Sequence, residues 1–294
     1  MKSVLSVVAG KLSRGTRRDL GIAGHAGRRR ISLSDVTVSL AVSVLCCQGA
    51  FAAGPIDTDG PDFVDSSEVV GKNRFQFEAD LVADRNRRDP AHRRTISTPT
   101  LLKYGITDSL ELRLDTAGWN WSTVAPDGGP RVSETGAGDT ALSVKWHSQN
   151  RDSSAGVPAV SWIADAVMPS GGENFKGHGV RPSLRSVVTW DLPRDFNLAL
   201  MPGLKYDATS QGHRYLSGML GINVGKGWSE SFRTFVEGAF AQVAPSEDGG
   251  ILAYWDVGAA YLITNDWQVG FRFAIPANHN TPNSYTLIEL AGRF

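Results

Sequence analysis

The sequence predicts an all-β fold, a twelve-stranded antiparallel up-and-down β-barrel. Three observations support this expectation. Polar and apolar residues alternate with a period of two along repeated segments, as they do in strands with one apolar face. Long and short connections between these segments also alternate, and the large aromatic residues gather near the segment ends.

The period-two alternation is clearest in residues 74–81, RFQFEADL. The Phe, Ala and Leu side chains share one face of such a strand, whereas Arg, Gln, Glu and Asp share the other. The pattern recurs in residues 266–275, and no stretch has a convincing apolar period of 3.6 residues. Twelve strands are expected, at residues 73–83, 95–105, 109–118, 139–147, 159–168, 182–190, 196–206, 214–224, 231–241, 252–262, 266–275 and 284–294.

The connections after odd-numbered strands are long, as at 84–94 and 119–138. Most of those after even-numbered strands are short, as at Thr107-Asp108, with 148–158 as the exception. An up-and-down topology therefore gathers the long loops at one end of the barrel and the short turns at the other. We call these the long-loop end and the short-turn end. Outer-membrane barrels have this asymmetry.

The aromatic residues distinguish a membrane barrel from a soluble one, in which alternation would also occur. With the apolar faces turned outward, the large rings form two belts separated by smaller aliphatic residues. Such belts are typical of proteins whose rings lie at the two membrane interfaces. We therefore expect an outer-membrane barrel of a Gram-negative bacterium. The predicted membrane girdle at the short-turn end consists of Phe75, Tyr104, Trp146, Trp190, Phe196, Phe232, Tyr261, Trp267 and Phe294.

The opposite face of the strands carries too many charged residues for a packed apolar core, which predicts a polar lumen. Two interpretations remain open. The charges line a water-filled, weakly selective constriction, or they form a salt-bridged interior with almost no opening. The predicted lumen-lining residues are Arg74, Glu78, Lys103, Glu111, Arg113, Asp115, Lys145, Asp165, Arg185, Lys205, Arg233, Glu237, Asp256, Arg272 and Glu289.

Residues 1–53 are organised like a secretory signal peptide with an extended n-region. A basic cluster at 28–30 precedes an apolar run at 36–47 and the small-residue site at 50–52. The mature protein is expected to begin near residue 53 or 54. An uncleaved transmembrane anchor is the alternative, but the second half of the charge-free window is small and polar.

The mature chain is expected to have two parts. Residues 54–72 are acidic, contain Gly and Pro and lack periodicity, so they form either a periplasmic tail or a plug in the lumen. Residues 73–294 form the barrel. Both cysteines, Cys46 and Cys47, fall in the predicted signal peptide, so no disulfide is expected in the mature protein.

Charge and motif content exclude several kinds of function. Residues 1–52 hold 8 basic and 2 acidic side chains, which leaves 22 basic and 28 acidic ones in the remainder. The mature chain therefore lacks the excess of basic residues that is typical of nucleic-acid-binding proteins. The mean hydropathy of −0.18 argues against a helical membrane protein. No phosphate loop or metal-ligand cluster is found, and the spacing of His178, His213 and His279 fits no compact metal motif, so no cofactor is expected.

The order of four short motifs resembles one family. The motifs are TPTLLKYGITDSLELRL (98–114), GAGDTALSVKW (136–146), MPSGGENF (168–175) and DVGAAYLITNDWQVGFRF (256–273). They are similar to outer-membrane proteins of the phenol meta-pathway (MetA-like) transporter family. The resemblance covers about residues 75–294. It implies an outer-membrane channel for passive uptake of small molecules, with aromatic or hydrophobic compounds as the suggested class, and it implies no catalytic residues.

Two other functions are alternatives to a channel. One is a closed structural or adhesion-type outer-membrane barrel. The other is a lipid hydrolase, since outer-membrane phospholipases are also twelve-stranded and use a Ser–His–Asn arrangement. Here His147 and Ser148 are adjacent on a strand and point to opposite faces, so they cannot share a proton in the required way. We therefore expect no enzyme activity.

The expected partners follow from the barrel's setting. Outer-membrane lipid surrounds it, and the basic loop 84–94 either binds lipopolysaccharide phosphates or is simply solvated. The final strand, ending at Phe294, resembles the signal read by the barrel-assembly machinery. The solute is a small molecule. One wall with Lys103, Arg113, Lys145, Arg185 and Lys205 would favour anions.

Overall fold

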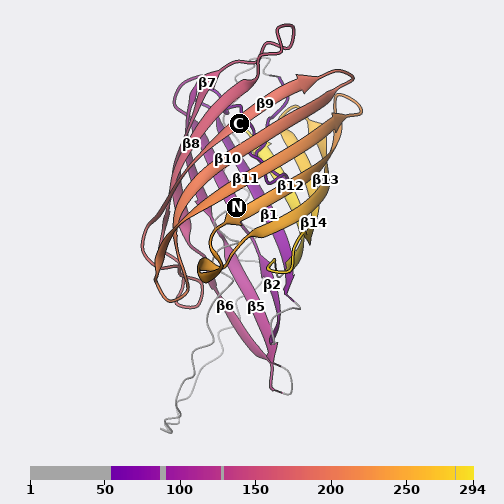
Figure 1. Ribbon diagram of the computed structural model, residues 1–294. Coiled ribbons are helices and arrows are strands. Elements are labelled where there is room, and N and C mark those ends of the chain that lie inside the picture. The colour runs from indigo at the N-terminus through magenta and orange to yellow at the C-terminus, as the bar shows by residue number, and fades with distance from the viewer. Residues whose placement is uncertain (1–53, 87–90, 127–128, 282) are drawn as a thin grey trace, which may run out of the picture. The chain divides into compact units, whose positions relative to one another are not determined.

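The computed structural model describes residues 54–86, 91–126, 129–281 and 283–294. These residues form one antiparallel sheet that closes on itself (Figure 1). The signal peptide expected at residues 1–53 and residues 87–90 of the expected basic loop lie outside the described residues.

The strands follow the expected order along the chain. They are β1 (Phe75–Asn86), β2 (Ala91–Ser97), β3 (Thr100–Gly105), β4 (Leu110–Thr116), β5 (Trp119–Pro126), β6 (Val132–Ala137), β7 (Thr140–Gln149), β8 (Ala159–Met168), β9 (Arg181–Leu192), β10 (Phe196–Ala208), β11 (Arg214–Gly227), β12 (Phe232–Val243), β13 (Leu252–Thr264), β14 (Trp267–Pro276) and β15 (Asn283–Arg293).

Twelve of these strands close the barrel, which confirms the predicted fold and strand number. The ring runs from β15 down to β7 in sequence order and continues through β4, β3 and β1. It closes where β1 pairs with β15, from Gln76 opposite Arg293 to Asn86 opposite Asn283. Every neighbouring pair is antiparallel, as an up-and-down topology requires.

The strands β2, β5 and β6 extend the sheet beyond the ring at the long-loop end (Figure 1). The loops expected at 84–94 and 119–138 are therefore wrong over most of their length, because β1, β2, β5 and β6 occupy much of them. The alternating pattern is interrupted between β4 and β5, so the sequence did not indicate that strands continue there. Gly118 has a φ of 67°, and a Cβ there would lie 1.8 Å from the Thr98 carbonyl oxygen, so only glycine fits.

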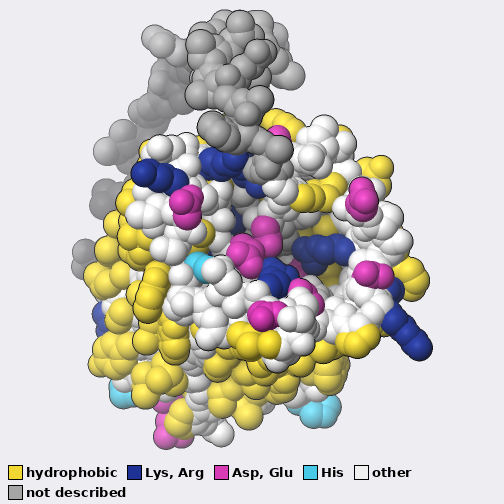
Figure 2. Space-filling model, turned by 90° about the horizontal axis from the view of Figure 1, so that it is seen from above, with side chains coloured by type: hydrophobic (Ala, Val, Ile, Leu, Met, Phe, Trp, Pro, Cys, Tyr) yellow, Lys and Arg dark blue, Asp and Glu magenta, His cyan; other side chains and the backbone are white. Residues whose placement is uncertain are grey.

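The outer face of the barrel is apolar (Figure 2). Leu112, Leu142, Val144, Phe271 and Ile288 are exposed, as are many similar side chains around the ring. Among the described residues, no helix is long and apolar enough to cross a membrane.

The predicted girdle residues also lie on this outer face. Trp190 and Trp267 are half-buried, and Trp267 packs edge-on against Phe77 and Phe294, with ring centroids 5.8 and 5.9 Å away. The other seven are exposed: Phe75, Tyr104, Trp146, Phe196, Phe232, Tyr261 and Phe294.

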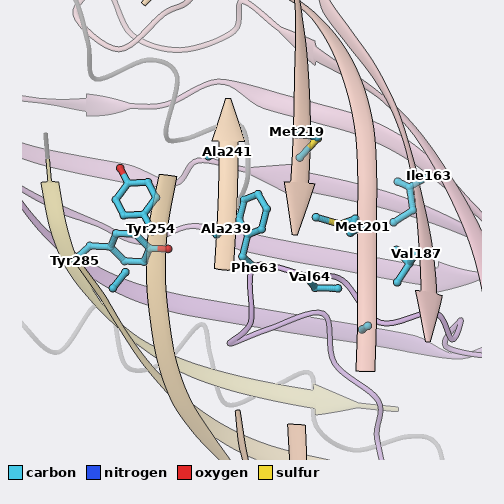
Figure 3. Packing of buried hydrophobic residues seen from close by; sticks show 12 residues of the cluster. Phe63, Val64, Ile163, Val187, Met201, Met219, Ala239, Ala241, Tyr254 and Tyr285 are labelled. Atoms are coloured by element: carbon cyan, nitrogen blue, oxygen red, sulfur yellow. The ribbon is translucent and has the colours of Figure 1, made fainter. Parts of the chain in front are cut away.

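Buried side chains lie inside the barrel rather than on its outside. An apolar cluster, which we call the lumen patch, is formed by inward positions on β8 to β15 together with Phe63 and Val64 (Figure 3). Besides these two, it contains Ile163, Val187, Ala199, Met201, Met219, Ala239, Ala241, Tyr254, Ala274 and Tyr285. The interior thus has an apolar region that the expected polar lumen did not include.

Candidate functional site

The alternation of the strands turns the predicted lumen residues inward. Five of them are half-buried: Arg74, Asp115, Asp165, Lys205 and Arg233. The other ten are buried: Glu78, Lys103, Glu111, Arg113, Lys145, Arg185, Glu237, Asp256, Arg272 and Glu289. Their partners are largely supplied by residues 56–70, which contact the wall from inside and which we call the lumen segment.

Backbone amides of the lumen segment donate hydrogen bonds to glutamates of the wall. The amides of Phe63 and Val64 each lie 2.7 Å from a carboxylate oxygen of Glu237 on β12. The Val70 amide lies 2.7 Å from Glu111 on β4. Glu78 on β1 accepts from the Asp59 and Gly60 amides at 3.1 Å. The segment has no regular secondary structure, and these hydrogen bonds give partners both to its buried N–H groups and to the wall carboxylates.

The acidic side chains of the segment pair with basic side chains of the wall. Asp59 has three such partners: Arg113 Nη2 at 2.7 Å, Lys103 Nζ at 2.9 Å and Lys145 Nζ at 3.0 Å. These four residues are almost completely buried. Burial alone would raise the pKa of Asp59, but the neighbouring Arg113, Lys103 and Lys145 hold it well below its usual value. Asp59 therefore stays ionised inside the barrel.

Three further ion pairs follow along the segment. Asp62 lies 3.0 Å from Arg233, Asp65 lies 2.8 Å from Arg185, and Glu68 lies 2.7 Å from Arg151. Arg185 also bonds Asp165, and Arg151 also bonds Asp191 at 2.8 Å. The basic wall that was expected to attract anions is therefore neutralised by carboxylates of the same chain.

The middle of the segment inserts two apolar side chains into the lumen patch. Phe63 is 2% exposed and Val64 is 4% exposed. Figure 3 shows them between Met201 and Met219 on one side and the pair of tyrosines, Tyr254 and Tyr285, on the other. A Cβ added at Gly221 of β11 would lie 2.5 Å from Val64 Cγ2 and 3.1 Å from Phe63 Cδ1. The segment therefore fits closely against the wall here.

A Ser–His–Asn cluster also holds the segment, although not the one considered from the sequence. His147 Nδ1 lies 2.8 Å from the Ser67 carbonyl oxygen and His147 Nε2 lies 2.8 Å from Asn150 Oδ1. The hydroxyl of buried Ser161 donates to the same Ser67 carbonyl. Ser148 instead donates to the Val160 carbonyl oxygen at 3.1 Å. Because Ser161 and His147 both bind the segment's backbone, this geometry anchors the segment and presents no exposed nucleophile.

Two cavities border the lumen segment. A cavity of about 320 Å³ lies on its short-turn side, lined by Asp62, Val64, Asp65, Arg151 and Arg233 among others. Figure 2 looks toward this end and shows acidic and basic side chains gathered in the mouth. A second cavity of about 40 Å³ lies deeper, lined by residues that include Asp59, Phe63, Asp65, Arg113 and Arg185.

The histidines that were compared with metal-ligand motifs in the sequence take part in separate contacts. His178 Nε2 lies 2.9 Å from the Ser210 carbonyl oxygen, and His213 Nε2 lies 3.6 Å from Asp248. Within the part of the chain that the structure describes, no group of three or more His, Cys, Asp or Glu side chains could hold a metal ion.

Comparison with known proteins gives one family and one fold. The family model described as "Putative MetA-pathway of phenol degradation" matches residues 58–294. Among solved structures, the chain is similar to an outer membrane channel from Pseudomonas putida F1, with a TM-score of 0.60 and 10% identity, covering 78% of this chain and 98% of that chain. At this identity the similarity establishes the barrel fold.

Two further solved structures give lower scores. The KdgM porin has a TM-score of 0.47 and 11% identity, covering 74% of this chain and 99% of that chain. The CymD monoaromatic hydrocarbon channel has a TM-score of 0.43 and 10% identity, covering 76% and 88%. No curated protein matches the chain by sequence.

Proposed function

Because the chain belongs to the family of the MetA pathway of phenol degradation, we propose that it is an outer-membrane channel for passive uptake of small molecules in a Gram-negative bacterium. The observation that carries the proposal is the construction of the barrel. Its outer face is apolar and its interior holds ionised side chains, the arrangement of a barrel with lipid outside and water inside.

The lumen segment gives the channel a plugged resting state. It is attached to the barrel by one covalent connection, at the start of β1, and otherwise by hydrogen bonds, ion pairs and the packing of Phe63 and Val64. None of these contacts is part of the ladder that closes the barrel. The segment can therefore leave the lumen without breaking a strand pairing, and solutes then diffuse through without an energy source.

The proposed solutes are small aromatic or hydrophobic compounds. The family's description names phenol degradation. The lumen patch supports this class, because a fully polar interior would offer no favourable surface to an aromatic ring.

Other parts of the molecule have roles consistent with this setting. Residues 1–53 direct export and are removed. Membrane lipid contacts the aromatic girdle. The β15 strand, with Phe294 after it, is the element that the barrel-assembly machinery recognises. The basic residues on β1 and β2, Arg85, Arg93 and Arg94, bind lipopolysaccharide phosphates at the long-loop end.

The second candidate function is a closed structural barrel. It is favoured by the ion pairs, which fill much of the space that a solute would need. The two candidates differ in one respect: a channel releases the lumen segment, whereas a structural barrel keeps it in place.

The experiment that separates them is a planar-bilayer recording on the processed protein with cysteines at positions 64 and 221. The contact between Val64 and Gly221 brings the two positions close enough for a disulfide. Both native cysteines precede residue 54, so no other thiol interferes. We expect conductance steps from the wild type and from the reduced Val64→Cys/Gly221→Cys variant, and none from the oxidised variant. If no variant conducts, including one that lacks residues 54–70, the closed barrel is correct.

A further inference from the structure

We propose that the lumen contains a binding site for aromatic carboxylates, formed by Arg113, Arg185 and the lumen patch. In the resting protein the lumen segment occupies this site with its own carboxylates and Phe63. Solutes of this class open the channel by taking their place. The inference rests on the proposed channel function and names its solute class.

The first argument is the charge balance around Asp59. Three cations of the wall converge on this carboxylate, while Lys103 also lies 2.5 Å from Glu78 and Arg113 lies 3.9 Å from Glu111. Three positive charges thus face three negative ones. When Asp59 leaves, three cations face two carboxylates, so this part of the wall carries one excess positive charge that attracts anions. A solute carboxylate at this place restores the balance, whereas a cation or a neutral solute does not.

The second argument is the place that Phe63 occupies. Its ring is buried and belongs to the lumen patch, whose wall residues come from β8 to β15. The patch contains two methionines, Met201 and Met219, and an edge-to-face tyrosine pair, Tyr254 and Tyr285, with ring centroids 5.5 Å apart. Methionine and aromatic side chains make favourable contacts with rings and adapt to ring position. The region left by Phe63 therefore suits another six-membered aromatic ring.

The third argument is that the charged groups and the ring meet at one place. The cavity of about 40 Å³ is lined by Phe63 together with Arg113 and Arg185. A Cβ added at Gly203 would lie 2.7 Å from Arg185 Cβ and 2.9 Å from Met219 Cγ, so Arg185 borders the lumen patch directly. A single molecule with a ring and a carboxylate can therefore contact both.

The fourth argument is space. The volume of this cavity, about 40 Å³, is close to the volume of one water molecule in the liquid, roughly 30 Å³. It is far below the several hundred Å³ of an ordinary ligand pocket. An aromatic carboxylate cannot enter this cavity while the segment is in place, and the cavity of about 320 Å³ on the short-turn side is not lined by Arg113 or Arg185. Such a solute binds only when Phe63 and its neighbours leave, so binding and opening are the same event.

The test measures how fast a thiol-reactive probe labels Val64→Cys in the processed protein, reconstituted in liposomes. Val64 belongs to the lumen segment and is buried against the wall, so labelling reports the displaced state. We expect benzoate at about ten times its dissociation constant to accelerate labelling about tenfold, because it binds only the displaced form. Benzylammonium, with the same ring and the opposite charge, and acetate, with the charge and no ring, should have little effect. Equal acceleration by benzoate and benzylammonium, or none by benzoate, overturns the proposal.

A matched pair of variants separates the binding site from a general loosening of the segment. Asp65→Asn/Arg185→Gln removes an ion pair beside the lumen patch, and Glu68→Gln/Arg151→Gln removes one at the exposed mouth. We expect the first variant to lose most of the benzoate effect and the second to keep it. Unchanged benzoate effects in both variants overturn the assignment of Arg185.

The outcomes also distinguish this proposal from the channel function itself. If the reduced Val64→Cys/Gly221→Cys variant conducts but benzoate does not change labelling, the solute class is wrong and the channel stands. If labelling responds to benzoate in a protein that never conducts, the site exists in a closed barrel.

Discussion

The lumen segment contacts two walls of the barrel that differ in composition. On β3, β4 and β7 the contacting side chains are charged: Lys103, Arg113 and Lys145, with Glu111 binding the segment's backbone. On β8 to β15 an apolar cluster that includes Met201, Met219 and Tyr254 lies beside ion pairs at Arg185 and Arg233. We call the first side the charged wall and the second the apolar wall, since only the second adds apolar packing to its polar contacts.

The difference between the walls indicates a division of roles. Replacing a buried ion-pair network by apolar residues is often neutral, but removing one partner is strongly destabilising. The charged wall thus contributes little net stability while fixing where each carboxylate of the segment must lie. Burial of apolar area is favourable without such positional demands, by roughly 25 cal/mol per Å². The apolar wall therefore supplies affinity for the segment, and the charged wall sets its register.

The largest expected effect comes from breaking the charged wall with Asp59→Asn. The three buried cations then lose one anionic partner. This should weaken binding of the segment in the lumen by about 3–5 kcal/mol. Labelling of Val64→Cys should accelerate about a hundredfold or more in the Asp59→Asn background, since each 1.4 kcal/mol is a factor of ten.

Asp57→Asn is the matched control, because it removes the same charge from the same segment at an exposed position. Its labelling rate should stay near that of the parent protein. Equal rates for the two asparagine variants would mean that the three cations do not hold the segment.

The next effect compares the two faces of β7, a strand of the charged wall. Val144 is exposed on the outer face, and Ser143 is buried on the inner face. Val144→Arg should disfavour membrane insertion by about 2–4 kcal/mol if it lies near the bilayer midplane, because it places a charge in lipid. Ser143→Arg should cost less, because its neighbours are polar. Folding titrations into lipid vesicles measure both, and equal costs would contradict the assignment of the faces.

The faces of the strands could be predicted from the sequence, whereas the occupant of the lumen could not. Alternation is a local signal: in residues 74–81 each residue's face follows from its neighbours, because lipid demands apolar side chains outside. The lumen segment has no such period. Its contacts join residues far apart in the chain, such as Phe63 and Glu237, which are 174 positions apart.

Two signals in the sequence did point to the interior. The segment carries carboxylates at intervals of two or three residues, from Asp57 to Glu68, and the inward face of the strands carries basic residues that can pair with them. The inward positions of β8 to β11 include Ile163, Met201 and Met219, where a water-filled lumen would have polar residues. Together they indicate an interior partner that is both acidic and apolar. The hairpin of β5 and β6 was missed for another reason, since breaks in the pattern at Gly118 and near Asp139 resemble loop boundaries.

The smallest expected effect probes the apolar wall with Phe63→Leu. Leucine keeps much of the buried apolar area but lacks the flat shape of the ring that lies in the lumen patch. Swaps of this kind usually cost less than about 1.5 kcal/mol. The expected result is labelling of Val64→Cys faster by about fivefold, corresponding to roughly 1 kcal/mol. Phe63→Ala, which leaves a cavity, should cost about 3–5 kcal/mol if the wall cannot collapse. If Phe63→Ala weakens binding of the segment no more than Phe63→Leu does, the lumen patch has collapsed around the smaller side chain. The apolar wall then holds the segment by burial of apolar area alone and does not select for the shape of a ring.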